Sequence, residues 1–142
     1  MITEFKGEYR WLSNFWKFDT PLVYQKRLIF ETSEHFYQAM KSESYSVREL
    51  ISKHPSKGLK SFQKRYKVRD DWEDIKLDVM LYILRYKFSE NNPNLRHKLI
   101  ETGDLFIQEG NYWGDTFWGV DLRTGVGENN LGKLLMKVRG EL

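Results

Sequence analysis

The segment TSEHFYQAMK, residues 32–41, places Glu34 in the first turn of a predicted helix. Thr32 suits the N-cap position, because a threonine hydroxyl accepts a hydrogen bond from the free N–H groups of that turn. Gln38 follows Glu34 by four residues and therefore shares its helix face. A carboxylate in this position either interacts with the helix dipole or acts on a ligand, and the segment alone favours the dipole interaction.

His35 follows Glu34 directly and lies on a neighbouring helix face. We expect a partly buried, hydrogen-bonded side chain that orients Glu34 or packs near it. The other histidines are His54 and His97; their spacing is not that of metal ligands, and the chain has no cysteine. The sequence therefore predicts no metal site, no cofactor, no disulfide and no thiolate nucleophile.

A glycine-rich segment over residues 109–132 is a second candidate for chemistry. It carries three carboxylates and two tryptophans, namely Glu109, Asp115, Asp121, Trp113 and Trp118. Long loops of this kind are usually functional, and glycines let backbone N–H groups approach a ligand closely. The helix expected next begins near residues 128–129, and its N-terminus can hold a phosphate. The spacing matches neither a phosphate loop nor a dinucleotide fingerprint.

A third candidate is LSNF, residues 12–15, where Ser13 and Asn14 stand between Leu12 and Phe15. Asparagine tolerates left-handed backbone, so this segment alone favours a turn.

The composition describes a folded chain of 142 residues, which predicts one domain over residues 1–142. Five tryptophans, eight tyrosines and nine phenylalanines exceed the needs of so small a core, so we expect some of them to line a pocket. The sequence contains no apolar run as long as a signal peptide or a membrane span. These features predict a soluble, cytoplasmic protein that does not bind membranes.

The net charge of +3 is mild, but residues 41–69 carry nine lysines and arginines against two glutamates. A basic segment of this kind can attract phosphates or nucleic acid. The alternative is a solvated helix face, which the charge pattern alone favours.

Local patterns predict the elements that must position these residues. A hairpin is expected over 21–30, with its turn at Gln25–Lys26, and a helix over 32–42. Two short helices are expected over 46–53 and 55–65, with Pro55 in the first helical position. Residues 70–88 have the strongest helical pattern and should form a central helix. A helix over 92–103 closed by Gly103, a strand over 104–110 and a final helix over 128–140 complete the pattern.

Taken together and in order, these segments resemble the NADAR family, which is also called YbiA-like. The resemblance is carried by LSNF (12–15), TSEHFYQAMK (32–41), DDW (70–72), IQEG (107–110), DTFWG (115–119) and GENNLGKLLMKVR (127–139). It implies an α+β fold that is mostly helical with a small β-sheet. It also implies N-glycosidase activity, on ribosylamino intermediates of riboflavin synthesis or on ADP-ribosylated bases and related NAD-derived compounds.

The resemblance places Glu34 at the key acid of the family and Glu109 at the acid that ends a strand. Asp115 matches the acid before the Trp-Gly motif. Some members have a histidine where this chain has Gly114, so we assign no histidine base in the loop. The substrate-binding residues that we expect are Ser13, Asn14, Phe15, His35, Gln38, Trp72, Trp113, Trp118, Gly119, Asn129 and Gly132.

These residue types suit the cleavage of a C–N glycosidic bond. Positive charge builds on the ribose C1, so a carboxylate such as Glu34 can stabilise it and orient the attacking water. A second acid, Glu109 or Asp115, would help the base to leave, by analogy with glycoside hydrolysis. Tryptophans 72, 113 or 118 could stack on the base.

Two other functions compete with this interpretation. A non-catalytic module that binds ADP-ribose or NAD would use the same pocket. A nucleic-acid-binding protein would use residues 41–69, and its affinity would fall steeply with salt. A hydrolase of ADP-ribosylated nucleic acid would combine the basic segment with the pocket.

Overall fold

The computed structural model describes residues 1–142 as seven helices and two small two-stranded sheets. The elements in chain order are η1 (Gly7–Leu12), β1 (Lys17–Tyr24), β2 (Leu28–Thr32), α1 (Ser33–Ala39), α2 (Tyr45–Lys53), α3 (Leu59–Gln63), α4 (Trp72–Lys87), α5 (Pro93–Glu101), β3 (Gly110–Asn111), β4 (Val120–Asp121) and α6 (Asn130–Gly140). This architecture confirms the predicted α+β fold with mostly helical content. No helix is both long and apolar enough to cross a membrane.

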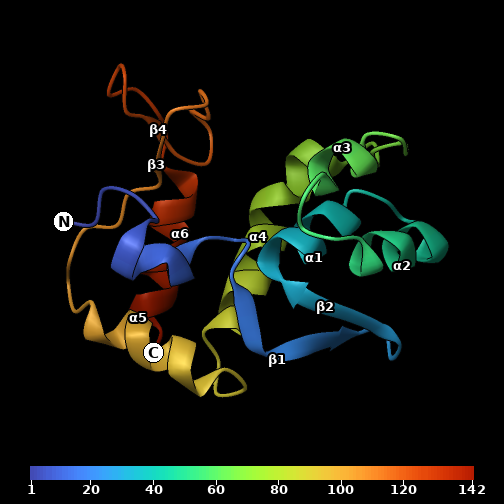
Figure 1. The fold of residues 1–142 in the computed structure, drawn as a ribbon, viewed down its shortest axis with the longest axis horizontal. Helices are drawn as coiled ribbons and strands as arrows, with labels where there is room; N and C mark the ends of the chain where they lie inside the picture. The colour runs from blue at the N-terminus through green and yellow to red at the C-terminus, as the bar shows by residue number, and fades with distance from the viewer.

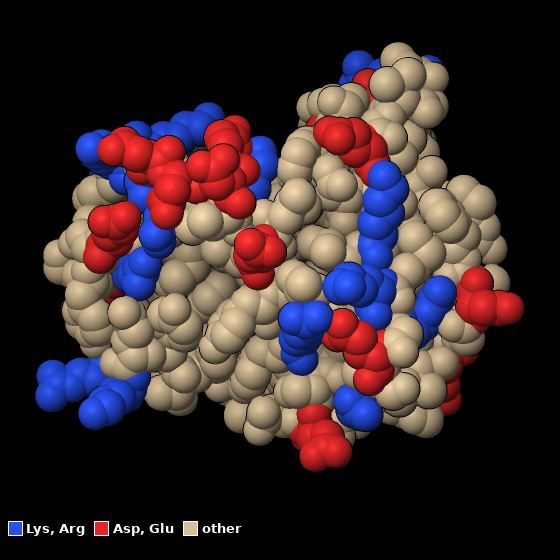
Figure 2. All heavy atoms as spheres, turned by 180° about the vertical axis from the view of Figure 1, so that it is seen from behind, with Lys and Arg blue, Asp and Glu red and all other residues tan.

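The long helix α4 runs through the middle of the molecule (Figure 1). On one side of it lie α1, α2, α3 and the β1–β2 hairpin, and on the other lie η1, α5, α6 and the β3–β4 pair. Helix α4 contacts both α1 and α6, which confirms its predicted central place. On the opposite face of the molecule, acidic and basic side chains are interspersed (Figure 2).

The hairpin forms as its sequence predicts. Strands β1 and β2 pair antiparallel, with Leu22 opposite Phe30. Gln25 and Lys26 have φ angles of 50° and 70°, the left-handed backbone that tight hairpin turns require. Alternate residues, including Leu22 and Phe30, enter the core, while Val23 stays exposed.

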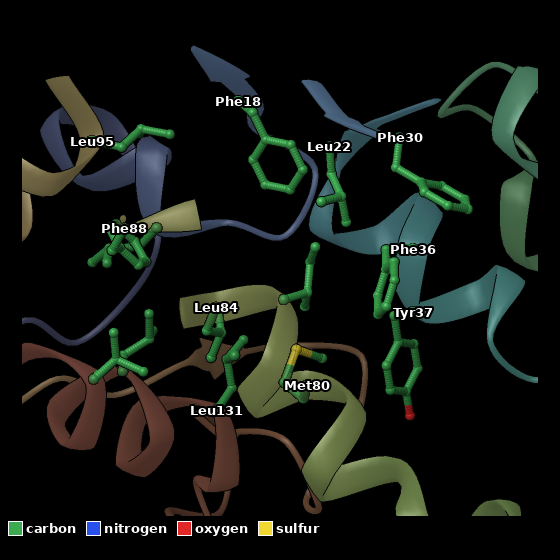
Figure 3. Close-up of a cluster of buried hydrophobic side chains, with 14 of the residues drawn as sticks. Phe18, Leu22, Phe30, Phe36, Tyr37, Met80, Leu84, Phe88, Leu95 and Leu131 are labelled. Carbon is green, nitrogen blue, oxygen red and sulfur yellow. The ribbon is translucent and has the colours of Figure 1, made fainter. Parts of the chain in front are cut away.

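The core joins these elements around α4 (Figure 3). Met80 and Leu84 of α4 meet Phe36 of α1, Phe30 of the hairpin and Leu131 of α6 in one buried cluster. Burying such side chains contributes about 1.5–3 kcal/mol each, so this cluster holds α1 and α6 in fixed positions against α4.

Two predicted boundaries are wrong. Helix α3 begins at Leu59 and not at Pro55, because Gly58 has a left-handed φ of 76°, which interrupts a right-handed helix. Of the predicted strand over 104–110, the structure keeps only an isolated bridge between Ile107 and Ile2 and, at its end, Gly110, which is the first residue of β3 and pairs with Val120. Helix α5 does close at Gly103, with φ of 62°, as predicted.

Candidate active site

A cavity of about 420 Å³ opens between two walls of the molecule. One wall is formed by α1 and α3, and the other by the loop that carries β3 and β4. In the ribbon of Figure 1, this loop and α3 lie on opposite sides of α4. The cavity brings together most of the site residues predicted from the sequence, namely Ser13, Asn14, Phe15, Glu34, Gln38, Glu109, Trp113, Asp115 and Trp118.

Glu34 lies in the first turn of α1 and is only 8% exposed. Gln38 Nε2 donates a hydrogen bond of 2.8 Å to Glu34 Oε1, and the Glu34 backbone N–H donates to the Asn14 carbonyl at 2.9 Å. The helix N-terminus and this donor both favour a negative charge. Thr32 caps the helix as predicted, because its hydroxyl accepts from the His35 N–H at 3.1 Å.

Two polar atoms on this wall are buried without a hydrogen-bond partner, Asn14 Oδ1 and Gln38 Oε1. A buried polar atom without a partner costs about 1–3 kcal/mol, and both residues line the cavity. These two oxygens are therefore available to accept hydrogen bonds from the hydroxyl or amino groups of a ligand.

Glu109 faces the cavity from the loop wall. Asn111 Nδ2 donates to Glu109 Oε2 at 3.1 Å, and a Cβ atom at Gly119 would overlap that same carboxylate oxygen. Burial raises the pKa of Glu109 to about 7, and the charge of Asp115 adds to the rise, while Asn111 and Lys60 oppose it. Glu109 can therefore carry a proton near neutral pH and donate it.

Asp115 is largely engaged in holding the loop together. Its Oδ1 accepts hydrogen bonds from the N–H groups of Phe117 at 3.1 Å and Trp118 at 2.9 Å. Its own N–H donates to Asn111 Oδ1 at 3.0 Å. Asp115 thus fixes the backbone around Trp118, and its charge helps to keep the proton on Glu109.

Asn129 and Gly132 lie behind the cavity, outside its lining. Asn129 Oδ1 accepts from the Glu109 N–H at 3.0 Å, and its Nδ2 donates to the Ile107 carbonyl at 2.9 Å. A Cβ atom at Gly132 would overlap that carbonyl. Both residues, expected to bind substrate, instead hold the segment that carries Glu109 against α6.

The N-terminus of α6 is not open to a phosphate. The N–H groups of Asn129, Asn130 and Leu131 donate to the carbonyls of Gly119, Phe117 and Trp118 at 3.2, 3.2 and 3.0 Å. The prediction of an anion site at this helix end is therefore wrong, because the loop itself uses these donors.

His35 has both ring nitrogens engaged away from the cavity. Its Nε2 lies 2.7 Å from the His54 carbonyl and its Nδ1 lies 2.7 Å from Thr32 Oγ1. A carbonyl only accepts, so Nε2 carries the hydrogen and Nδ1 accepts from the threonine hydroxyl. His35 is thus a buried, hydrogen-bonded side chain, and it does not line the cavity in which it was predicted to bind substrate.

Some aromatic residues are buried and pack against one another behind the cavity, while Trp113 is exposed in the cavity lining. Trp72 is buried outside the cavity lining and packs edge-on against Tyr37, with ring centroids 5.0 Å apart. Tyr37 in turn packs edge-on against Trp118 at 5.6 Å. Trp113 lines the cavity and is 69% exposed, so its ring face is free to stack on a ligand.

Sequence reasoning assigned no site role to several residues that line the cavity, which are Phe5, Lys6, Tyr37, Lys41, Lys60, Lys64, Met80, Gly110 and Leu131. Lys41 could have been predicted as a site residue from its spacing, since it follows Glu34 by seven residues and would share its face of the predicted helix. Lys60 and Lys64 are four residues apart in the basic segment, a spacing that predicts two positive charges on one helix face. The N-terminal residues reach the cavity through long-range contacts that no local pattern encodes.

The chain is similar to known proteins both in sequence and in structure. The model of the NADAR domain family matches residues 3–142. An N-glycosidase YbiA from Escherichia coli is 38% identical over 114 residues, which is 78% of this chain and 69% of that protein. An NMR structure of the E. coli protein YbiA superimposes with a TM-score of 0.80 at 32% identity, covering 99% of this chain and 82% of that one.

A riboflavin biosynthesis protein from Vibrio vulnificus is 40% identical over 115 residues, which is 78% of this chain. The match covers only 30% of that longer protein. The chain thus spans less than a third of this riboflavin biosynthesis relative.

Proposed function

Because the chain belongs to the NADAR family, we propose that it is an N-glycosidase that hydrolyses the C–N bond between ribose and a base or amine. The observation that supports this activity best is the pair of carboxylates on facing walls of one cavity. Glu34 has surroundings that favour its charge, whereas the pKa of Glu109 is raised to about 7. Acid–base cleavage of a glycosidic bond requires one carboxylate and one carboxyl that can donate a proton, and a pKa of about 7 suits Glu109 to the second role.

In the proposed reaction, the ribose lies with its C1 atom over Glu34. As the C–N bond breaks, positive charge on C1 is stabilised by the Glu34 carboxylate. The same carboxylate orients a water molecule and accepts its proton as the hydroxyl adds to C1. Gln38 holds Glu34 Oε1 in place, so the carboxylate is positioned before the substrate arrives.

Glu109 supplies the proton that the departing nitrogen needs. Hydrolysis leaves negative charge on the base or amine, and a protonated carboxyl at the opposite wall neutralises it. Asp115 is the less suitable donor, because one of its oxygens already accepts two backbone N–H groups. The proposal therefore assigns Glu109 as the general acid and Asp115 as a support of the loop.

The substrate is held by groups that the cavity leaves free. The unpartnered oxygens of Asn14 and Gln38 accept hydrogen bonds from the ribose hydroxyls, with Ser13 and Phe15 beside them. The exposed ring of Trp113 stacks on the base, and Trp118 forms the side of the cavity. Trp72, His35, Gly119, Asn129 and Gly132 act from behind these groups as positioning residues.

The decisive experiment compares wild type with Glu34→Gln in a turnover assay. The substrates are a phosphorylated ribosylaminopyrimidine, of the kind found in riboflavin synthesis, and an ADP-ribosylated oligonucleotide. We expect the variant to keep its melting temperature, since Gln38 can still donate to the new amide oxygen, and to lose about 10²–10⁴ in kcat.

Calorimetry with ADP-ribose separates this proposal from a non-catalytic binding module. A module of that kind binds ADP-ribose in both forms of the protein and releases no product from either substrate. Full turnover by Glu34→Gln would remove Glu34 from the catalytic role.

A further inference from the structure

Lysines 41, 60 and 64 all line the cavity. None of them lies within 4.0 Å of a carboxylate oxygen, so the cavity contains positive charges without ion-pair partners. Lys6, which also lines the cavity, differs from them, because its Nζ lies 3.5 Å from Glu4 Oε1.

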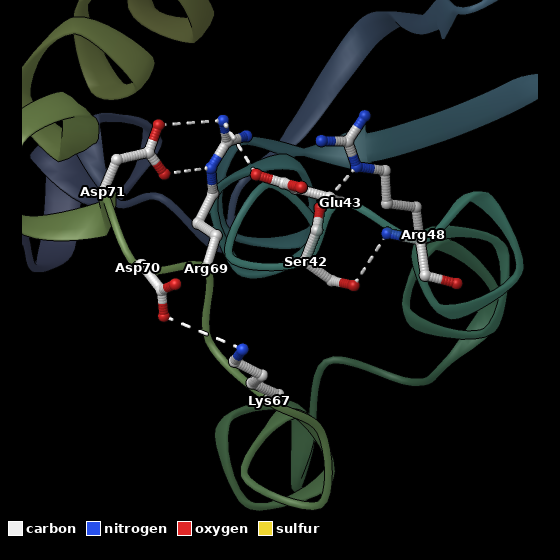
Figure 4. A network of polar contacts seen from close by, with 8 residues as sticks. Ser42, Glu43, Arg48, Lys67, Arg69, Asp70 and Asp71 are labelled. Atoms are coloured by element: carbon white, nitrogen blue, oxygen red, sulfur yellow. Dashed lines mark hydrogen bonds and ion pairs between the residues drawn. The ribbon is translucent and has the colours of Figure 1, made fainter.

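Most other lysines and arginines of the basic segment 41–69 already form an ion pair or a hydrogen bond within the protein, and Figure 4 shows several of these contacts. Arg69 bonds Asp71 at 2.6 Å, and Lys67 lies 3.7 Å from Asp70. Arg48 is buried and donates from its Nε to the Ser42 carbonyl at 2.7 Å. The segment therefore offers few free charges for a nucleic-acid backbone, and those that remain are concentrated at the cavity.

The three lysines converge from two helices. Lys41 directly follows the C-cap of α1, and Lys60 and Lys64 stand one turn apart at α3, which packs on α1. Burial lowers the pKa of Lys41, the positive charges of Lys60 and Lys64 lower it further, and Glu34 opposes the change. The lysines therefore repel one another, and a bound anion would relieve that repulsion.

We propose that Lys41, Lys60 and Lys64 form a subsite for a phosphoryl group of the substrate. The proposal rests on the proposed function, because it places the ribose between Glu34 and Glu109 and its phosphoryl substituent toward α3. The same chemistry fits the 5-phosphate of a ribosyl monophosphate and the pyrophosphate of an ADP-ribosyl group. The subsite lies on the wall of α1 and α3, and the N-terminus of α6 takes no part because its donors are used.

The test uses a double variant, Lys60→Met with Lys64→Met, whose side chains are exposed and whose loss should leave folding intact. The matched control is Lys57→Met with Arg65→Met, which removes the same charge from the same segment outside the cavity. Calorimetry measures binding of ribose 5-phosphate, ADP-ribose and unphosphorylated ribose to each protein. Thermal melting confirms that all three proteins are folded.

We expect the cavity double variant to bind its phosphorylated ligand at least about tenfold more weakly, as expected for lost charge-assisted bonds, and the control to change less than about twofold. If ribose 5-phosphate loses affinity, the subsite binds a monophosphate; if ADP-ribose loses affinity, it binds a pyrophosphate. An equal loss in both double variants, or no loss in either, overturns the subsite.

Failure of the subsite and failure of the proposed function can be told apart. Binding of ribose 5-phosphate or ADP-ribose requires no turnover, so lysine-dependent binding without hydrolysis supports the subsite and contradicts the N-glycosidase. Equal kcat/KM for a ribosylaminopyrimidine with and without its phosphate overturns the subsite and leaves the N-glycosidase intact.

Discussion

The two walls of the cavity are built in different ways. The wall of Glu34 comes from a run of neighbouring residues, in which Thr32 caps the helix and Gln38 supports the carboxylate. The wall of Glu109 is held by residues that are distant in sequence, since Asn129 accepts from its N–H and Gly119 leaves the space for its carboxylate.

The difference also explains why the pKa of Glu109 is raised. Glu34 has a helix N-terminus and a side-chain donor, which are local sources of positive potential. Glu109 has a single side-chain donor and is otherwise desolvated, so its pKa rises. The helix wall thus favours a base, and the loop wall favours an acid.

Among the substitutions that distinguish the two walls, Glu109→Gln should cause the largest loss of activity. We expect kcat to fall about 10²–10⁴ because the leaving nitrogen loses its proton donor. In wild type the rate should decline as pH rises through about 7, since Glu109 then loses the proton it must donate. The variant should lack that decline. A pH–rate profile from pH 5 to 9 measures both, and a decline retained in the variant would assign the acid elsewhere.

Gly119→Ala should damage the loop wall while leaving the helix wall intact. Its new methyl group would overlap Glu109 Oε2 and the Glu109 carbonyl, so the carboxylate must move. We expect a loss of about 1–3 kcal/mol in the free energy of unfolding, together with a large loss of kcat. Gly140→Ala is the matched control, because a Cβ atom there meets nothing within 4 Å. Equal behaviour of the two variants would contradict the role of Gly119.

Asn129→Gly tests the distant brace of the loop wall. Glycine accepts the left-handed φ of 53° at this position, so the change removes only the side chain. The Glu109 N–H and the Ile107 carbonyl then lose their partner, at a cost of about 1–3 kcal/mol. Urea unfolding measures the stability, and KM should change less than kcat if the residue positions Glu109 and does not touch substrate.

Thr32→Ala should have the smallest effect on activity and should act on the helix wall. It removes the N-cap acceptor of α1 and the hydroxyl that donates to His35 Nδ1, so we expect a loss of about 1–3 kcal/mol in the free energy of unfolding. We expect activity to stay within a fewfold of wild type, because core packing and the contact with Asn14 still hold Glu34. Thermal melting and turnover measure the two effects. A loss of activity as large as that of Glu109→Gln would show that core packing and the Asn14 contact do not hold Glu34 in place without the Thr32 cap.

The same contrast sets how much could be predicted. The hairpin turn at Gln25–Lys26, the cap at Thr32 and the helix over residues 70–88 depend on neighbours along the chain, and all were predicted. The grouping of Glu34 and Glu109 in one site came from the family resemblance and not from local patterns.

What could not be predicted depends on partners far away in sequence. The shortening of the strand over 104–110 and the occupied N-terminus of α6 are set by tertiary contacts. An asparagine at position 129 is typical of a helix N-cap, but the sequence does not show that its side-chain amide hydrogen-bonds the backbone of Ile107 and Glu109.

The closed N-terminus of α6 has a consequence for the order in which the protein is made. Residues 107–119 leave the ribosome before Asn129, Asn130 and Leu131, whose N–H groups bind the loop carbonyls. A nascent chain can therefore cap the helix of Glu34 early, but it cannot fix the loop of Glu109 until α6 has been synthesised. The two walls of the cavity are thus completed at different stages of translation.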